Sequence, residues 1–329
     1  MTANAIPTRV GISRLTHRRE SGTFAGLLLL SLALWAATPY FATVENLVNV
    51  LEQTAVVGVL SVGMTFVILA GGIDLSVGSL VAFAGIAFGA ASHAGVPTVL
   101  AATLGVAAGA LAGLANGLLV TTGRLPPFIA TLGTMSVARG AALMLTDGRP
   151  ISGFPASVRA IAHAAPLGIP APVLLMLAVV AAAHVALTRT VLGRYVYAVG
   201  GNEVAAALSG VSIDAWKCAV YVLSGVASGL TALLLVARLD SAQPVAGMGY
   251  ELDAIAAVVI GGASLLGGSG TVLGTLIGAL LMTVLRNGLN LLSVSSYVQQ
   301  VAIGLVIIAA VIVDMTLHRR AERRRAENV

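Results

Sequence analysis

The chain has little charge, a single lysine and a single cysteine, and each shortage excludes a class of function. Only 9% of its 329 residues are charged, whereas a soluble domain carries about a quarter. One cysteine, Cys218, excludes a disulfide framework and a cysteine-ligated metal site. The lysine, Lys217, is followed by Cys218 and not by a hydroxyl residue, so the phosphate-binding pattern G-x-x-x-x-G-K-[ST] is absent. We therefore expect no ATP site of that type on this chain, and no cofactor or metal of its own.

Acidic residues and histidines are few and scattered. No Ser/His/Asp arrangement or metal-ligand spacing is present, so we do not expect an enzyme. A carrier driven by protons or ions usually buries carboxylates or histidines in mid-membrane. Most acids here fall at the ends of hydrophobic runs or between them, and Asp74 is the exception. An ion-gradient-driven carrier for a small polar solute therefore stays open as an alternative, with Asp74 as its only support.

Long hydrophobic runs take the place of charge. Hydrophobic residues make up 58% of the chain, and about 20 apolar residues suffice to cross a membrane. We predict an all-α polytopic membrane protein with about ten transmembrane helices, at residues 22–42, 51–70, 75–93, 97–121, 125–146, 171–188, 215–237, 251–266, 270–291 and 297–315. The first run has no small-residue cleavage pattern after it, so we expect it to remain as an anchor.

The second and third spans are separated by an unusual polar sequence. Residues 71–79 read GGIDLSVGS within a long apolar stretch. Glycines, a carboxylate and hydroxyls cannot face lipid without internal partners, so such a break must be packed in protein or line a watery path. GGASLLGGS at 261–269 is a weak echo of it, and transporters are often built from repeats with interrupted segments. This pattern predicts a protein that conducts a solute.

Two spans carry glycines at a spacing of four, which places them on one helical face. They are Gly105, Gly109, Gly113 and Gly117 in the fourth span, and Gly270, Gly274 and Gly278 in the ninth. Such faces either slide during a transport cycle or pack statically, and the spacing alone favours static packing.

The basic residues orient the predicted bundle. Most of the 18 Lys and Arg residues fall on one side, namely Arg9, Arg14, Arg18, Arg19, Arg124, Arg189, Arg194, Lys217, Arg319, Arg320, Arg323, Arg324 and Arg325. By the positive-inside rule both termini are cytoplasmic, giving a cytoplasmic tail at 1–21, a membrane domain at 22–316 and a basic tail at 317–329. The net charge of +5 fits contact with anionic lipid headgroups; with no soluble domain to bind it, we expect no nucleic-acid partner.

The longest cytoplasmic loop, residues 189–214, contains a predicted short helix. Asn202 can cap a helix that begins at Glu203, an acid that suits the helix dipole. Ala205, Ala206 and Ala207 give a surface of small residues. Gly210 can end the helix. A short helix with little side-chain bulk suits docking into a groove of a partner protein.

This loop resembles the coupling loop of ATP-binding-cassette importer permeases. A more specific resemblance is carried by VARLDSAQPVAGMGYELDAIAAVVIGGASLLGG at 236–268, together with GGIDLSVGS, GTLIGAL at 274–280 and NGLNLLSVSSY at 287–297. These segments resemble the ribose-type sugar permeases of that class, and the similarity covers about residues 50–314.

The resemblance implies a multi-pass permease subunit of the bacterial inner membrane that imports a monosaccharide. The sugar expected from it is ribose or a related pentose. Its implied partners are a cytoplasmic ATPase subunit, which binds ATP and Mg, a periplasmic sugar-binding protein, and a second permease copy or close paralogue. The coupling contact would be made by Asn202, Glu203, Ala205, Ala206 and Gly210.

Five polar residues within or beside spans are candidates for the sugar pathway. They are Asp74, Ser76, Asn116, Asn287 and Asn290. Each could instead make an interhelical hydrogen bond, the common use of such groups.

Two arginines and one connecting segment complete the predictions. Arg139 and Arg286 in or near spans are expected to pair with acids, carbonyls or headgroups. The segment 238–253, which includes Asp240, could touch the binding protein or form a short re-entrant connection.

Overall fold

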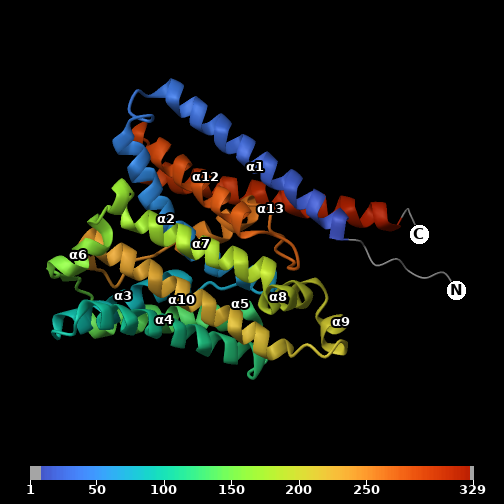
Figure 1. Ribbon diagram of the computed structural model, residues 1–329, viewed down its shortest axis with the longest axis horizontal. Coiled ribbons are helices and arrows are strands. Elements are labelled where there is room, and N and C mark those ends of the chain that lie inside the picture. The colour runs from blue at the N-terminus through green and yellow to red at the C-terminus, as the bar shows by residue number, and fades with distance from the viewer. Residues whose placement is uncertain (1–8, 327–329) are drawn as a thin grey trace.

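The computed structural model describes residues 9–326 as an almost wholly helical bundle (Figure 1). The predicted tails at 1–21 and 317–329 fall partly outside this range, because residues 1–8 and 327–329 lie outside the described residues. The helices are α1 (Arg9–Ala37), α2 (Val44–Leu69), α3 (Val77–His93), α4 (Thr98–Thr121), α5 (Pro127–Thr146), α6 (Ala156–His163), α7 (Ala171–Arg189), α8 (Val191–Gly201), α9 (Glu203–Leu208), α10 (Ile213–Leu239), α11 (Tyr250–Ile260), α12 (Val272–Leu291) and α13 (Ser296–Ala326), with a 3₁₀ turn η1 (Pro166–Gly168).

Within the described residues, eight helices are long and apolar enough to cross a membrane. They are α1, α2, α4, α5, α7, α10, α12 and α13. Each of the eight overlaps a span predicted from the hydrophobic runs. The chain is thus an all-α polytopic membrane protein. Two of the ten predicted spans are shorter: α3 has 17 residues and α11 has 11.

The span predicted at 251–266 is not a single crossing helix. At 1.5 Å per residue, the 11 residues of α11 rise only about 16 Å, roughly half of a hydrocarbon core of about 30 Å. The helix stops at Ile260 because Gly261 and Gly262 follow, and Gly262 has a positive φ of 94°. The apolar run continues past this point, which is why hydrophobicity alone overestimated the helix.

The predicted break between the second and third spans is confirmed. Helix α2 ends at Leu69 and α3 begins at Val77, with no helix in between. Gly71 adopts a φ of 79°, a conformation that side-chain-bearing residues rarely take. Gly72, Asp74 and Ser76 are buried, so the polar groups of the break are packed in protein. Such packing is required because lipid tails offer polar groups no hydrogen bonds.

The glycine face of the fourth span packs against α10. A Cβ added at Gly109 or Gly113 would overlap the backbone carbonyls of Gly225 or Tyr221, and one added at Gly117 would lie 2.7 Å from the Sγ of Cys218. Gly105 faces α3 at Phe88. In α12, Gly278 approaches the α11 backbone at Ala257 and Gly274 approaches Gly261 just after α11, whereas Gly270 precedes α12. The glycine spacing therefore corresponds to close helix contacts.

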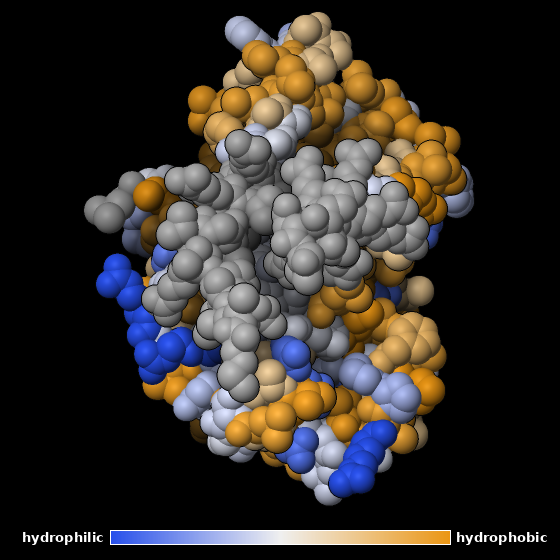
Figure 2. Space-filling view, turned by 90° about the vertical axis from the view of Figure 1, so that its right-hand side faces the viewer, coloured by the Kyte–Doolittle hydropathy of each residue, from blue (hydrophilic) through white to orange (hydrophobic). Residues whose placement is uncertain are grey.

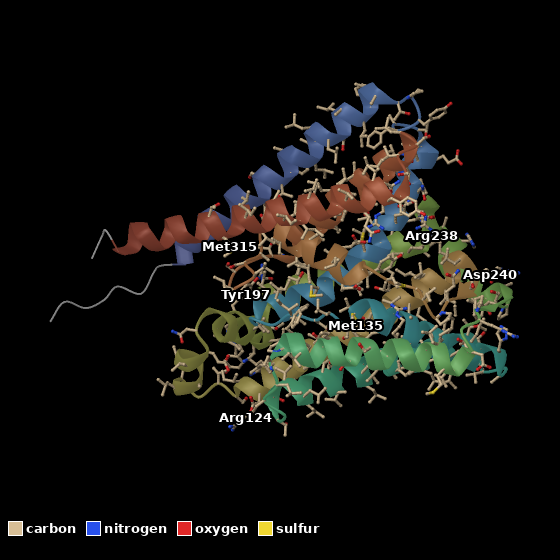
Figure 3. The ribbon with its side chains drawn as sticks, turned by 180° about the vertical axis from the view of Figure 1, so that it is seen from behind. Arg124, Met135, Tyr197, Arg238, Asp240 and Met315 are labelled. Atoms are coloured by element: carbon tan, nitrogen blue, oxygen red, sulfur yellow. The ribbon has the colours of Figure 1, made fainter. Side chains whose placement is uncertain are left out.

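The two ends of the bundle differ in construction. At one end lie α8 and α9, together with the start of α1 and the end of α13 (Figure 1). At the other end, β1 (Ile151–Ser152) pairs antiparallel with β2 (Ser241–Ala242) beside α6. Figure 3 places Arg124 and Tyr197 toward the first end and Arg238 and Asp240 at the second. On the end that carries α9, hydrophilic and hydrophobic side chains are interspersed on the lower part of the visible face (Figure 2).

Candidate functional site

Asp74 and Ser76 form the centre of a buried hydrogen-bond network. One Asp74 carboxylate oxygen accepts bonds from the Ser76 backbone N–H at 3.0 Å and its hydroxyl at 2.6 Å. The other oxygen accepts from the hydroxyl of Ser224 on α10 at 2.8 Å. Asn116 on α4 donates its amide to the Ser76 hydroxyl at 2.8 Å. All four side chains are 0% exposed, so this network joins the break to two neighbouring helices.

The network satisfies most of its groups. A buried carboxylate is costly unless it is hydrogen-bonded, and Asp74 has three donors next to the N-terminal end of α3, where the helix dipole favours an anion. Only the carbonyl oxygen of Asn116 lacks a partner among the described residues. The sequence placed Asp74 and Ser76 at the break and Asn116 beside the glycine stripe of the fourth span, without connecting them. It gave no signal for Ser224, a lone serine in a long span.

Asn287 and Asn290 do not join this network. Asn287 exchanges amide hydrogen bonds of 2.8 and 3.1 Å with Asn46 on α2. Asn290, on the exposed side of α12, accepts from Gln299 on α13 at 2.8 Å. Their shared helix therefore brings them to two different helix–helix contacts. The predicted pathway residues thus occupy three separate places, each with hydrogen-bond partners.

Both unexplained arginines have partners of the predicted kinds. Arg139 on α5 donates through Nη1 to the carbonyls of Pro244 and Ala246, each at 2.8 Å. Arg286 on α12 donates through Nη2 to both carboxylate oxygens of Asp253 at 2.9 Å. Arg139 thereby fixes the irregular stretch that leads from β2 into α11, and Arg286 fixes α11 against α12.

The predicted short helix in the loop at 189–214 is confirmed as α9. The Asn202 side chain accepts a hydrogen bond from the Ala205 N–H at 2.9 Å, the cap expected for a helix beginning at Glu203. Gly210 follows the helix with a φ of 82°. Glu203 pairs with Lys217 at 2.6 Å, which connects α9 to the second turn of α10.

The surface of α9 differs from the prediction at one position. Ala206 is only 5% exposed and faces the protein, so its assignment to the small-residue surface is wrong. Ala205 and Ala207 are exposed, but the large exposed apolar side chains are Val204 at 70% and Leu208 at 86%. They stand four residues apart on one helical face, a pattern that three consecutive alanines in the sequence concealed.

A glycine junction links α8 to the break at 71–79 and to the echo segment at 261–269. We use this name for Gly71, Gly200, Gly267 and Gly268, which lie in backbone contact. The Gly268 N–H donates to the Leu69 carbonyl at 2.9 Å, and a Cβ at Gly200 would overlap that same carbonyl oxygen. The echo segment at 261–269 thus lies against the start of the break at 71–79.

Tyr197 reinforces the junction from α8. Its hydroxyl donates to the Gly270 carbonyl at 2.7 Å. Burial, with a further contribution from the negative charge of Glu20, raises the pKa of Tyr197 to about 12. The phenol therefore stays protonated and able to donate at any physiological pH.

The bundle, the break and the loop helix together match a known family. Residues 46–311 fit the family described as "Branched-chain amino acid transport system / permease component". The chain belongs to this permease family. It is a multi-pass protein of the bacterial inner membrane and the permease component of an ATP-binding-cassette import system, a class that also includes an ATPase and a periplasmic binding protein.

Several curated relatives cover nearly the whole permease. The ribose import permease protein RbsC of Escherichia coli (strain K12) is 47% identical over 299 residues, spanning 90% of this chain and 93% of that one. Its counterpart in Bacillus subtilis (strain 168) is 48% identical, over 90% and 92%. The D-allose transport system permease protein AlsC of E. coli is 39% identical, over 91% and 92%. No solved structure matches this permease.

Proposed function

We propose that this permease imports ribose. The observation that carries the proposal is the identity of 47–48% to ribose import permeases from two distant bacteria over 90% of the chain. The permease named for D-allose is less similar, at 39%. The family description names branched-chain amino acids, but the more similar relatives carry a sugar in their names.

ATP hydrolysis on a separate ATPase subunit drives transport in this proposal, so ATP and Mg are bound outside this chain. The ATPase docks on α9, where Val204 and Leu208 offer an exposed apolar contact and Asn202, Glu203, Ala205 and Gly210 hold the helix in place. Ala206 supports it from the buried side. A second permease copy, or a close paralogue, completes the membrane part of the importer.

Both termini are cytoplasmic in this proposal, and the chain crosses the membrane ten times. The start of α1 and the end of α13 lie at the end of the bundle that carries α9 (Figure 1). The short helix α11 completes a crossing together with the irregular residues 243–249. The opposite end, with β1, β2 and Asp240, then faces the periplasmic binding protein.

The pathway candidates take supporting positions beside the sugar route. Asp74, Ser76 and Asn116 set the shape of the break, which α3 and the glycine junction adjoin. Asn287 and Asn290 hold α12 against α2 and α13. We propose that these contacts shift as the importer alternates between outward-facing and inward-facing states.

A substrate competition assay tests the proposed sugar. The permease is reconstituted in proteoliposomes with its ATPase, the binding protein and ATP, and labelled ribose uptake is measured against unlabelled ribose, allose and leucine. Ribose should compete most strongly, allose weakly and leucine not at all. Uptake blocked by leucine alone would move the permease to the amino-acid branch of its family.

A further inference from the structure

A cavity of about 120 Å³ with a mixed polar and apolar lining lies between α2, α10, α11 and α12. Its polar lining consists of Gln53, Arg238, Tyr250, Asp253, Thr283 and Arg286. None of these residues belongs to the Asp74 network or to the glycine junction. Ionisable groups inside a membrane domain are rare and mark substrate paths more often than other positions do.

The charged groups of the cavity are paired, but some of their hydrogen-bond donors have no acceptor among the described residues. Asp253 is 5% exposed and receives both of its bonds from Nη2 of Arg286. For the remaining guanidinium nitrogens of Arg286, Nε and Nη1, the described residues supply no acceptor. Arg238 donates to Asn49 at 2.8 Å and lies 3.9 Å from the carboxylate of Glu52. Donors and acceptors thus converge on one small space.

Thr283 lines the same space and carries a hydroxyl without a hydrogen-bond partner among the described residues. This side chain is 4% exposed, and its hydroxyl has no hydrogen-bond partner within the described part of the chain. A buried hydroxyl without a partner is costly and calls for an explanation, such as a ligand or an ordered water. No hydrogen bond holds the Gln53 amide among the described residues either, and this side chain is partly exposed.

The size and position of the cavity suit one sugar ring. An apolar cavity of about 150 Å³ holds benzene, so the 120 Å³ here limits an occupant to one small ring and has no room for a disaccharide. Val56, Leu235 and Met282 give the lining an apolar part, which suits the C–H face of a ring while the polar groups meet its hydroxyls. Arg238 lies at the end of the bundle opposite Tyr197 and Arg124 (Figure 3).

We propose that this cavity is a monosaccharide subsite on the import path, where the Thr283 hydroxyl, the Gln53 amide and the Arg286 guanidinium bind sugar hydroxyls transiently. The inference rests on the proposed function, because it takes the β1–β2 end as the side from which sugar arrives. Its donors and acceptors select a polyhydroxylated solute over a branched-chain amino acid, whose apolar side chain would leave them unpaired.

Two isosteric substitutions test the subsite. Thr283→Val and Thr231→Val each replace a buried threonine whose hydroxyl has no partner among the described residues, but only Thr283 lines the cavity. In the reconstituted importer, Thr283→Val should raise the ribose concentration for half-maximal uptake about three- to tenfold, the effect of one hydrogen bond. Thr231→Val should transport as the unsubstituted protein does, and Thr283→Ser should restore most of the affinity.

Thiol labelling gives a second readout that does not depend on the hydroxyl. Cys218 is the only cysteine, so Gln53→Cys in a Cys218→Ala background places one thiol in the cavity. Ribose should protect this thiol from a water-soluble maleimide, and leucine should not. Full reactivity with ribose present, together with unchanged uptake by Thr283→Val, would overturn the subsite and leave the cavity as a hydrated ion pair.

The two proposals fail in different ways. Absence of ATP-driven ribose uptake by the unsubstituted importer would contradict the proposed function. Normal uptake by the unsubstituted importer and by Thr283→Val alike would contradict only the subsite. Equal losses in Thr283→Val and Thr231→Val would also contradict it, since the effect would then come from packing and not from the cavity.

Discussion

The Asp74 network and the cavity beside Arg286 are both polar clusters, but the first is fully buried, whereas the second is lined in part by exposed side chains. Asp74 accepts three hydrogen bonds in a space that is 0% exposed. The cavity holds an ion pair, open volume and a hydroxyl without a partner among the described residues. Each cluster has one buried atom without a partner among the described residues, the Asn116 carbonyl oxygen in the first and the Thr283 hydroxyl in the second, but only the second cluster has open volume that can receive a solute. The comparison predicts that substitutions in the first cluster mainly affect folding, and in the second mainly affect transport.

The largest effect is expected from Asp74→Ala. The substitution leaves the Ser76 N–H, the Ser76 hydroxyl and the Ser224 hydroxyl without their acceptor, at a cost of about 3–5 kcal/mol. The thermal unfolding midpoint of the detergent-purified permease should fall sharply. Asp74→Asn keeps one acceptor oxygen, so its unfolding midpoint should lie between those of the unsubstituted permease and Asp74→Ala. An unchanged midpoint with transport abolished would instead place Asp74 on the pathway, as its sequence position suggested.

A substitution in the glycine junction should disturb the contact of α8 with the break at 71–79 and with the echo segment at 261–269. Gly200→Ala brings a methyl group into the Leu69 carbonyl, whereas nothing lies within 4 Å of a Cβ at Gly201. Overpacking at such a contact costs about 1–3 kcal/mol. ATP-driven uptake should fall at least tenfold in Gly200→Ala and stay unchanged in Gly201→Ala. Equal behaviour of the two variants would show that the junction does not connect α8 with the breaks.

A charge on α9 should disturb docking without disturbing the bundle. Leu208 is 86% exposed, so Leu208→Asp leaves the permease folded but places a carboxylate in the apolar contact. Copurification of the ATPase should drop about tenfold or more, the effect expected at the centre of an interface. Ser209→Ala is the control, because the Ser209 hydroxyl bonds only to the Ala205 carbonyl of its own helix. Undiminished copurification with Leu208→Asp would remove α9 from the ATPase contact.

The smallest effect on stability is expected at Asp240. Its ion pair with Arg159 measures 3.7 Å and is well exposed, and such pairs contribute about 1 kcal/mol or less. Asp240→Lys also removes the acceptor of the Phe154 N–H at 3.3 Å, so the unfolding midpoint should fall slightly, by less than in Asp74→Ala. ATPase activity stimulated by the binding protein should drop. Unchanged stimulation would count against a contact between this segment and the binding protein.

Local sequence rules predicted the features that depend on local chemistry. The break at 71–79, the Asn202 cap and the close packing of the α4 glycines follow from a carboxylate amid apolar residues, a capping side chain and a spacing of four. The partner types of Arg139 and Arg286 followed from the cost of an unpaired charge in a membrane.

Features that depend on tertiary contacts could not be predicted. Ala206 faces inward because of the way α9 lies on α8 and α10, and Ala205 and Ala207 look the same in the sequence. Asn46 and Ser224 acquire their roles from residues about 240 and 150 positions away. The cavity is formed by four helices, and none of its residues makes a motif with its sequence neighbours.

The measurement that tests the central claim most directly is labelled ribose uptake under two driving forces. One set of proteoliposomes holds the permease alone with an imposed proton or sodium gradient. The other holds the permease with its ATPase, the binding protein and ATP. Uptake only in the ATP set is the predicted result. Gradient-driven uptake by the permease alone would contradict the importer function and make Asp74 the first candidate for ion coupling.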